Sequence, residues 1–476
     1  MRYDNQANRI RKEVLVRVAK AFMSDRPKAV IDRVPLEMRP KDGDASRCCI
    51  YKDREVLKHR TMAALGFSVE DETDELTPLR DYFDAALQRE AVKDTGLTVI
   101  DIACSACLKG SYLVTNACRG CLGRACQTNC PKGAIDFVNG HAVINPELCV
   151  NCGLCLKACP YNAIVRTPIP CEESCPVKAI SKDESGREVI DQEKCISCGQ
   201  CVVACPFAAI QERSQMIDVL KKLKNSRSTV ALLAPAIVGQ FPGTLEQIAA
   251  ALEKMGFARV EEVSAGADET GRLEAAEWKE RIGAGAPFMT TSCCPAYIEA
   301  VKKHVPELAP FVSHTPSPMA ISAHWVKEAD PQVTTVFIGP CVAKRTEALQ
   351  NPDVDYVLTF EELGAMLIAT KIDVLECEPV TLSRSGKAGG RGFPVSGGVT
   401  GAIQAHLGEA ADALKPVAFN GLDSKSLIRL KMAAARGCGG NFIEVMCCEG
   451  GCQSGPGVLC NPVVAGRKLT ELLAGS

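Results

Sequence analysis

The spacing of the cysteines constrains the fold of this chain more than any other feature. Two runs have the form CxxCxxCxxxCP without deviation, and they cover residues 149–160 and 195–206. Thiolates at this spacing can hold three corners of an iron–sulfur cubane, because soft sulfur ligands suit iron and the short spacers wrap one face of the cluster. The fourth cysteine of such a run ligates a second cluster, so these runs come in pairs. The sequence therefore predicts a module of several clusters.

The partner of the first run lies directly upstream. Residues 118–131 hold a run with a slightly stretched third position, and together the two runs resemble a bacterial ferredoxin. The crossing rule predicts one 4Fe-4S cluster held by Cys118, Cys121, Cys126 and Cys159. It predicts a second cluster held by Cys130, Cys149, Cys152 and Cys155.

The partner of the second run is incomplete, because residues 171–175 supply only its last two cysteines. If the first ferredoxin unit is inserted into the second, the missing pair is Cys104 and Cys107. A third cluster is then held by Cys175, Cys195, Cys198 and Cys201, and a fourth by Cys104, Cys107, Cys171 and Cys205. In the alternative, Cys104 and Cys107 form a small zinc site or a free dithiol, and three clusters exist. In both cases, closely spaced clusters serve to carry single electrons.

Composition excludes several classes of protein. The chain has 476 residues, 27 of them cysteine, and a net charge of -2, so no general basic footprint for nucleic acid is present. The first twenty residues lack a secretory apolar core, and no window approaches the length of a membrane span. Thiols of a large intracellular chain are kept reduced, which favours metal ligation over disulfides. We expect a cytoplasmic protein that binds neither nucleic acid nor a membrane.

The positions of the cysteines divide the chain into three expected regions. Residues 1–95 carry amphipathic helical patterns and form an N-terminal helical region. Residues 96–215 form an α+β ferredoxin-like domain with several 4Fe-4S clusters. Residues 216–476 show apolar strands near helical runs, which predicts an α/β domain. Its best strand candidates are TVALLAPA, RVEEVSAG, TTVFIGP and VDYVLT.

Three segments of the last region concentrate its cysteines. They are TSCCPAY at 291–297, GPCVAKR at 339–345 and EVMCCEGGCQSGPG at 444–457. Segments that follow strands can meet at one end of a parallel sheet, where sites of α/β proteins usually form. The three segments resemble the signature motifs of the iron-only, or FeFe, hydrogenases, with similar spacing over about residues 229–460. The resemblance implies a catalytic domain of two lobes with parallel sheets around an active-site cluster.

The resemblance also implies a reaction and a cofactor. The reaction is the reversible interconversion of molecular hydrogen with protons and electrons. The cofactor is the H-cluster, a 4Fe-4S cluster that one cysteine bridges to a two-iron subcluster with carbon monoxide, cyanide and dithiolate ligands. The implied ligands of the 4Fe-4S part are Cys294, Cys341, Cys448 and Cys452, with Cys452 as the bridge. The implied neighbours of the cofactor are Pro235, Ala236, Phe393, Ser396 and Met446.

Two further groups acquire a role from the resemblance. Lys344 would donate a hydrogen bond to a cyanide ligand, and Cys293 would be a free thiol that passes protons to the subcluster. The glycines of the third segment would let the backbone approach a bulky inorganic group. Cys447 stands where the family often has alanine, and we expect it to be a packed neighbour.

A proton path is implied as well. Glu274, Glu277 and Arg281 share one face of an expected helix. That pattern alone is typical of a solvated, ion-paired helix face, but the segment precedes TSCC at nearly the distance found in the family, and Ser313 completes the resemblance. We expect a relay from Arg281 and Glu277 at the surface, through Ser313 and Glu274, to Cys293.

Departures from the family pattern indicate a less-studied branch. Gly339, Ala236 and Met319 replace residues that are usually methionine, serine and glutamine, and none of the three is a metal ligand. The expected partners are maturation enzymes and an external one-electron carrier such as ferredoxin. Two alternatives remain: a hydrogen sensor, and a hydrogenase-like iron–sulfur assembly protein that lacks the two-iron subcluster. Cys293, Lys344 and the proton path argue against the second alternative.

Overall fold

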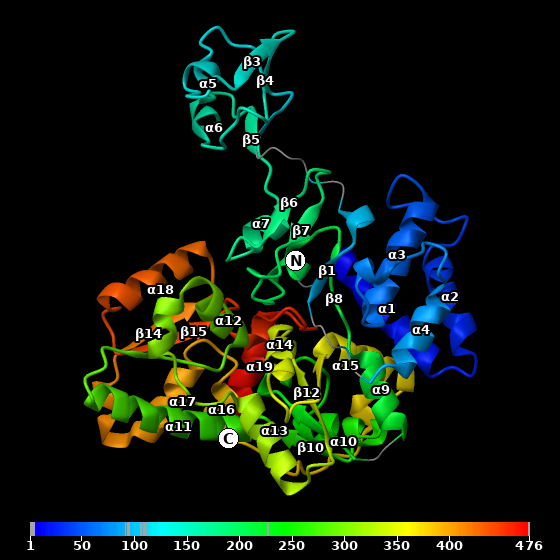
Figure 1. The fold of residues 1–476 in the computed structure, drawn as a ribbon, viewed down its shortest axis with the longest axis vertical. Helices are drawn as coiled ribbons and strands as arrows, with labels where there is room; N and C mark the ends of the chain where they lie inside the picture. The colour runs from blue at the N-terminus through cyan, green and yellow to red at the C-terminus, as the bar shows by residue number, and fades with distance from the viewer. Residues whose placement is uncertain are drawn as a thin grey trace.

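The structure is a computed structural model that describes residues 5–90, 92, 96–104, 107, 112–225 and 228–474. Figure 1 shows a body of two lobes, with the N-terminal helices against one lobe and the cluster-binding region above. In the described part of the chain, no helix combines the length and apolar character that a membrane crossing requires.

The first lobe is built on a parallel sheet of four strands in the order β10-β9-β12-β13. All four strand candidates of the sequence fall in this one sheet, and every residue of β9 is buried. Such a near-continuous apolar strand is typical of a parallel sheet covered on both faces. The strands are β9 (Thr229–Leu233), β10 (Arg259–Glu262), β12 (Thr334–Gly339) and β13 (Tyr356–Thr359), and the helices that follow them are α10 (Leu245–Met255), α11 (Ser264–Gly283), α14 (Ala343–Leu349) and α15 (Phe360–Thr370).

The second lobe contains a smaller parallel sheet in the order β11-β15-β14. These strands are β11 (Met289–Thr290), β14 (Pro416–Asn420) and β15 (Phe442–Met446). The sequence did not reveal this sheet, because β11 has two residues and β14 leaves most of its residues at least partly exposed. Its helices are α12 (Pro295–His304), α16 (Ala388–Gly392), α17 (Gly398–Leu407) and α18 (Ser424–Arg436), whereas α13 (Pro318–Ala329) packs in the core of the first lobe and α19 (Pro462–Ala474) ends the described chain. The expected fold of two lobes with parallel sheets is therefore confirmed.

The N-terminal helices share the core of the first lobe. Val14, Leu15 and Val18 on α1 belong to the same cluster of buried side chains as the residues of β9. The guanidinium of Arg11, on the same helix, lies 2.7 Å from the carboxylate of Glu361 on α15, and both side chains are buried. Residues 5–90 thus extend the hydrophobic core. The helices are α1 (Gln6–Phe22), α2 (Pro27–Met38), α3 (Ile50–Ala64) and α4 (Leu79–Gln88).

The cluster-binding region has one unit nested within another. The outer unit is closed by antiparallel pairing of β1 (Leu97–Val99) with β8 (Ile210–Glu212), and the inner unit by pairing of β2 (Tyr112–Val114) with β5 (Ile164–Arg166). This is the insertion that the cysteine spacing predicts. The inner unit also contains α5 (Ala125–Thr128), α6 (Leu154–Ala158), β3 (Ile135–Val138) and β4 (His141–Ile144), and the outer unit contains α7 (Pro170–Ser174), α8 (Gln200–Ala204), β6 (Ile180–Lys182) and β7 (Glu188–Ile190). The helix α9 (Met216–Asn225) connects the region to the first lobe.

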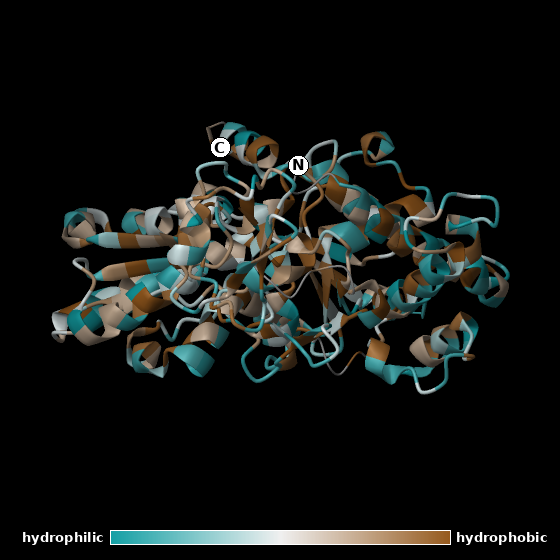
Figure 2. Cartoon of the chain, turned by 90° about the horizontal axis from the view of Figure 1, so that it is seen from above, coloured by the Kyte–Doolittle hydropathy of each residue, from teal (hydrophilic) through white to brown (hydrophobic). Residues whose placement is uncertain are grey.

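Figure 2 shows the hydropathy along the chain from above, with brown apolar segments on the strands inside the body and teal segments on the outer helices. The helices therefore turn their polar faces outward over the two sheets. The loops that follow the strands remain inside the body, where they form the site described next.

Candidate functional site

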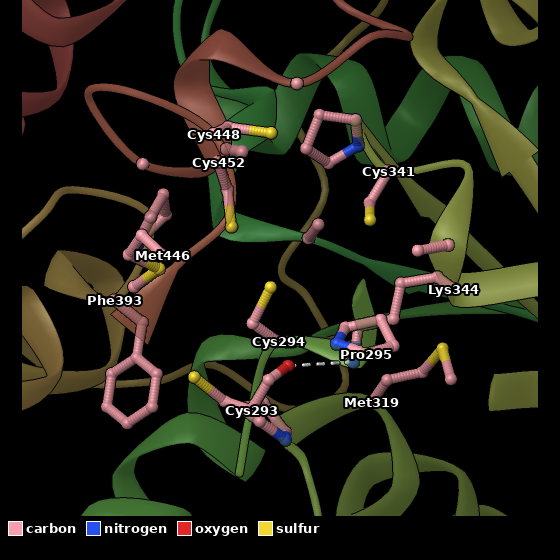
Figure 3. A pocket seen from close by; sticks show the side chains of 18 of the residues that line it. Cys293, Cys294, Pro295, Met319, Cys341, Lys344, Phe393, Met446, Cys448 and Cys452 are labelled. Carbon is pink, nitrogen blue, oxygen red and sulfur yellow. Dashed lines mark hydrogen bonds between the residues drawn. The ribbon is translucent and has the colours of Figure 1, made fainter. Parts of the chain in front are cut away.

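A cavity with about 890 Å³ of space free of protein atoms lies where loops from both sheets meet. Its walls come from segments that follow β9, β11, β12 and β15, so the carboxyl ends of parallel strands supply them, as in other α/β sites. The three cysteine segments of the sequence all reach this cavity. Figure 3 shows Cys294, Cys341, Cys448 and Cys452 around it.

The local sequence explains how these thiols reach the cavity. Cys294 precedes α12 as its N-cap, and Pro295 takes the first helical position, where a missing N–H costs nothing. Gly451 and Gly455 belong to the third segment. A Cβ atom at Gly451 would lie 2.2 Å from the carbonyl oxygen of Pro394, and one at Gly455 would lie 2.5 Å from that of Pro340. These glycines line the cavity, and they also let the backbone segments around it pack closely together.

The donor set of this cavity fits an iron–sulfur cluster. The lining is almost wholly apolar apart from thiols and Lys344, and burial raises the pKa of Cys341 and Cys452 to about 12. The four thiols therefore stay protonated unless a cation compensates their negative charge. Iron provides that charge, and it prefers sulfur ligands.

The structure brings most of the expected cofactor neighbours to the cavity. Pro235, Ala236, Phe393, Met446 and the two groups Cys293 and Lys344 line it, as does Met319. Lys344 Nζ donates to Glu347 Oε2 at 2.6 Å, to Ser317 Oγ at 3.0 Å and to the carbonyl oxygen of Cys293 at 3.4 Å. Ser396 is not among the lining residues. Its backbone nitrogen faces Gly451 instead.

The residues of the expected proton path lie near one another. The guanidinium of Arg281 lies 2.6 Å from Glu277 on α11, and Ser313 Oγ donates to Glu277 Oε2 at 2.6 Å. Ser313 also lies close enough to Glu274 to lower its pKa, and the side chain of Glu274 is fully buried and accepts hydrogen bonds from Ser292. The charge of Glu274 acts on the thiol of Cys293.

The two carboxyl groups of this path have different environments. Burial raises the pKa of Glu274 to about 7, against opposing hydrogen bonds from Ser292. Burial alone would also raise the pKa of Glu277, but hydrogen bonds from Ser313, His314 and Thr315 outweigh it and hold that pKa below its ordinary value. Burial raises the pKa of the Cys293 thiol well above its usual range. A proton on this path is thus held at the buried end and released at the outer end.

Sequence reasoning missed three members of this network. Thr315 Oγ1 donates to Glu277 Oε2 at 3.0 Å, and the backbone N–H of Ser292 donates to Glu274 Oε1 at 3.2 Å. The exposed ring of His314 lies with Nδ1 2.9 Å from Arg281 Nη2. These three residues are adjacent or nearly adjacent to Cys293 or Ser313 in the sequence, but no spacing rule identifies them as members of a proton path.

The accessory cysteines gather in the four predicted sets. One cavity of the inner unit is lined by Cys118, Cys121, Cys126 and Cys159, and another by Cys130, Cys149, Cys152 and Cys155. A third cavity, here called the proximal cavity, is lined by Cys175, Cys195, Cys198 and Cys201. Cys205 acts electrostatically on each of Cys104, Cys107 and Cys171, so the fourth set is also close together.

Comparison with known proteins adds an independent observation. The family model for the iron-only hydrogenase large subunit, C-terminal domain, matches residues 227–456, and the model for the 4Fe-4S binding domain matches residues 142–165 and 188–211. The periplasmic [Fe] hydrogenase large subunit of Nitratidesulfovibrio vulgaris is 32% identical over 329 residues, which are 56% of this chain and 77% of that protein. Iron hydrogenase 1 of Clostridium pasteurianum is 27% identical over 401 residues, 70% of this chain and 68% of that protein.

Two more distant similarities were also found. The cytosolic iron-sulfur assembly component 3 of Rattus norvegicus is 27% identical over 234 residues, 38% of this chain and 49% of that protein. A variant of apo [FeFe]-hydrogenase HydA1 from Chlamydomonas reinhardtii has a TM-score of 0.45 and 21% identity, and the match covers 54% of this chain and 87% of that one. The match covers 77% of the periplasmic hydrogenase large subunit at 32% identity, and the three cysteine segments meet in the cavity. The chain therefore belongs to the iron-only hydrogenase family.

Proposed function

We propose that this protein is an enzyme that interconverts molecular hydrogen with protons and electrons. The observation that carries the proposal is the meeting of four thiols, the free thiol Cys293 and the carboxyl path to the surface at a single buried cavity. A cluster scaffold needs the four thiols alone. A path that delivers protons to the same point is needed only if the bound group reacts with them.

The proposed cofactor is the H-cluster, and its binding residues follow from the cavity. Cys294, Cys341, Cys448 and Cys452 would hold the 4Fe-4S part, with Cys452 as the bridge, and Lys344 would donate to a cyanide ligand. When bound, this group supplies the metal centre that exchanges two electrons with hydrogen. Cys293 takes up or releases a proton beside it. Glu274, with a pKa of about 7, then exchanges that proton with Ser313 and Glu277 at neutral pH.

We also propose a function for each of the three regions of the chain. Residues 216–476 form the catalytic domain, residues 96–215 carry electrons through four 4Fe-4S clusters, and residues 1–95 stabilise the first lobe. The carrier that exchanges electrons with the outermost cluster is ferredoxin or a similar one-electron protein. Dedicated maturation enzymes would insert the two-iron subcluster.

Infrared spectroscopy tests the proposed function. The protein is matured with the two-iron subcluster and examined where metal-bound carbon monoxide and cyanide absorb. We expect bands that shift when hydrogen is added. If the 4Fe-4S sites are fully loaded and no such bands form, the protein is instead an assembly protein. That second function is favoured by the similarity to the rat assembly component.

A further inference from the structure

Cys198 borders two cavities at once, because it lines both the proximal cavity and the catalytic cavity. The wall between them is built by residues 198–200 on one side and residues 447–448 on the other. Cys447 is buried and lines the catalytic cavity, but it is not one of the proposed ligands. The wall therefore contains a thiol that the cluster assignments do not use.

Two side-chain contacts cross this wall. Gln200 Nε2 donates to Cys448 Sγ at 3.4 Å, and the thiols of Cys447 and Cys198 line the same cavity and pack in the same hydrophobic cluster. A cysteine that ligates a cluster has no proton left to give, so only Cys447 of these two thiols can act as a donor when the proximal cluster is bound. Each segment thus places a hydrogen-bond donor beside a ligand of the other segment's cluster. The sequence suggested a packed neighbour at Cys447, and the structure shows this additional contact.

We propose that Cys447 and Gln200 set the relative reduction potentials of the proximal cluster and the catalytic 4Fe-4S cluster. The inference rests on the ligand sets of the proposed function. Hydrogen bonds to the ligand sulfurs of an iron–sulfur cluster stabilise its more negative, reduced state and raise its potential. Cys447 acts on the proximal cluster through Cys198, and Gln200 acts on the catalytic cluster through Cys448. Both are positioning residues: one electron passes between the clusters, the S–H bond of Cys447 stays intact, and no proton accompanies the electron.

Electron paramagnetic resonance during a potentiometric titration tests this inference. In Cys447→Ala, the ratio of reduced to oxidised proximal cluster at a fixed potential should fall about two- to tenfold, the range for one net hydrogen bond. The catalytic 4Fe-4S cluster should not change. In Gln200→Leu, the catalytic 4Fe-4S cluster should shift by a similar factor and the proximal cluster should not.

Matched variants identify the signals and control for packing. The signal that disappears in Cys175→Ala belongs to the proximal cluster, and the signal that disappears in Cys341→Ser belongs to the catalytic cluster. Cys438 serves as the control, because its thiol bonds to the carbonyl oxygen of Gly440 and packs against the same hydrophobic cluster as Cys447. Cys438→Ala should leave both potentials unchanged. Cys447→Ser keeps a hydrogen-bond donor, so the potential of the proximal cluster should return most of the way to its wild-type value.

The outcomes separate this inference from the proposed function, because the titration needs no two-iron subcluster. The crossed pattern of shifts supports the inference even if the infrared bands are absent. Equal potentials in Cys447→Ala, Cys438→Ala and the wild type would overturn it, even if the infrared bands are present. A joint shift of both clusters in each variant would also overturn it. If Cys447→Ala binds less iron than the wild type, the potentials of the Cys447→Ser and Gln200→Leu variants test the inference instead.

Discussion

Ser313 Oγ donates a 2.6 Å hydrogen bond to Glu277 Oε2 and lies close enough to Glu274 to lower its pKa, so one hydroxyl group stands between an outer carboxylate and a buried carboxyl. The two glutamates lie three residues apart on α11, and a segment that follows β11 in the chain closes the gap between them. A hydroxyl group can accept a proton from one side and donate its own to the other. The position of Ser313 between the two carboxyl groups therefore supports the expected path.

Replacement of Glu274 tests the buried end of this path. In Glu274→Gln, we expect hydrogen evolution from a reduced viologen dye to fall about 10²-fold or more, since the amide cannot pass a proton on. Iron content should stay normal, because no ligand is altered. Glu269→Gln is the control on the same helix, where Glu269 pairs with Arg272 at the surface. Wild-type turnover in Glu274→Gln would remove Glu274 from the path.

Ser313 and Thr315 form a matched pair. Both donate to Glu277 Oε2, at 2.6 and 3.0 Å, and of the two it is Ser313 that also lowers the pKa of Glu274. We expect Ser313→Ala to slow turnover at least about tenfold and Thr315→Val to slow it by less. Equal rates for the two variants would show that the link between the carboxyl groups does not run through Ser313.

The pKa of Glu274 predicts a pH dependence of stability. Its folded value of about 7 lies above the ordinary value of 4.5, so the folded protein keeps a proton that the unfolded chain releases. The stability that this provides is fully present below pH 4.5 and is lost as the pH rises through 7, a difference of about 3 kcal/mol. Thermal unfolding should show wild-type stability falling relative to Glu274→Gln over this interval. A difference in stability between the two proteins that stays constant over this pH range would contradict the prediction.

The ion pair between Arg11 and Glu361 predicts the role of the N-terminal helices. Both side chains are buried, so Arg11→Ala leaves the Glu361 carboxylate with only the more distant Lys12, at 3.9 Å, and should cost about 3 kcal/mol. Limited proteolysis should then cut residues 5–90 faster than in the wild type. Arg17→Ala is the control, because Arg17 pairs with Glu13 and Glu37 at the surface. If the protease cuts both variants at the same rate, the buried ion pair does not hold the N-terminal helices to the first lobe.

The fourth accessory cluster can be counted. In Cys107→Ser, we expect the iron content to fall by about one cubane, because the electrostatic contacts of Cys205 place Cys107 with its set. Metal analysis after anaerobic reconstitution measures this loss. If the iron content is unchanged and zinc is lost instead, Cys104 and Cys107 form the small zinc site.

The sequence predicts some features of this molecule well because covalent spacing determines them. Cysteines separated by two residues face a common point, so eight accessory cysteines can be assigned to the sets that line the two inner cavities from the chain alone. The strands of the first lobe are also evident, because β9 is apolar at almost every position. The second sheet is not evident, because the two residues of β11 carry no periodic pattern.

Features that depend on contacts between distant segments could not be predicted in this way. The contact of Cys447 with Cys198 joins positions almost 250 residues apart, and no local pattern encodes it. The same is true of Arg11, whose partner Glu361 lies 350 residues further along the chain. The proton path was found only through the family resemblance, because the pattern of Glu274, Glu277 and Arg281 is that of an ordinary exposed helix face.

The pairing of β2 with β5 brings the start and the end of the inner cluster unit side by side. The rest of the cluster-binding region closes through β1 and β8 without it. Such a unit is modular, since it can be gained or deleted as a cassette while the surrounding strands keep their register. The distance over which the protein delivers electrons can therefore change in evolution, or by design, without any change at the place where they are used.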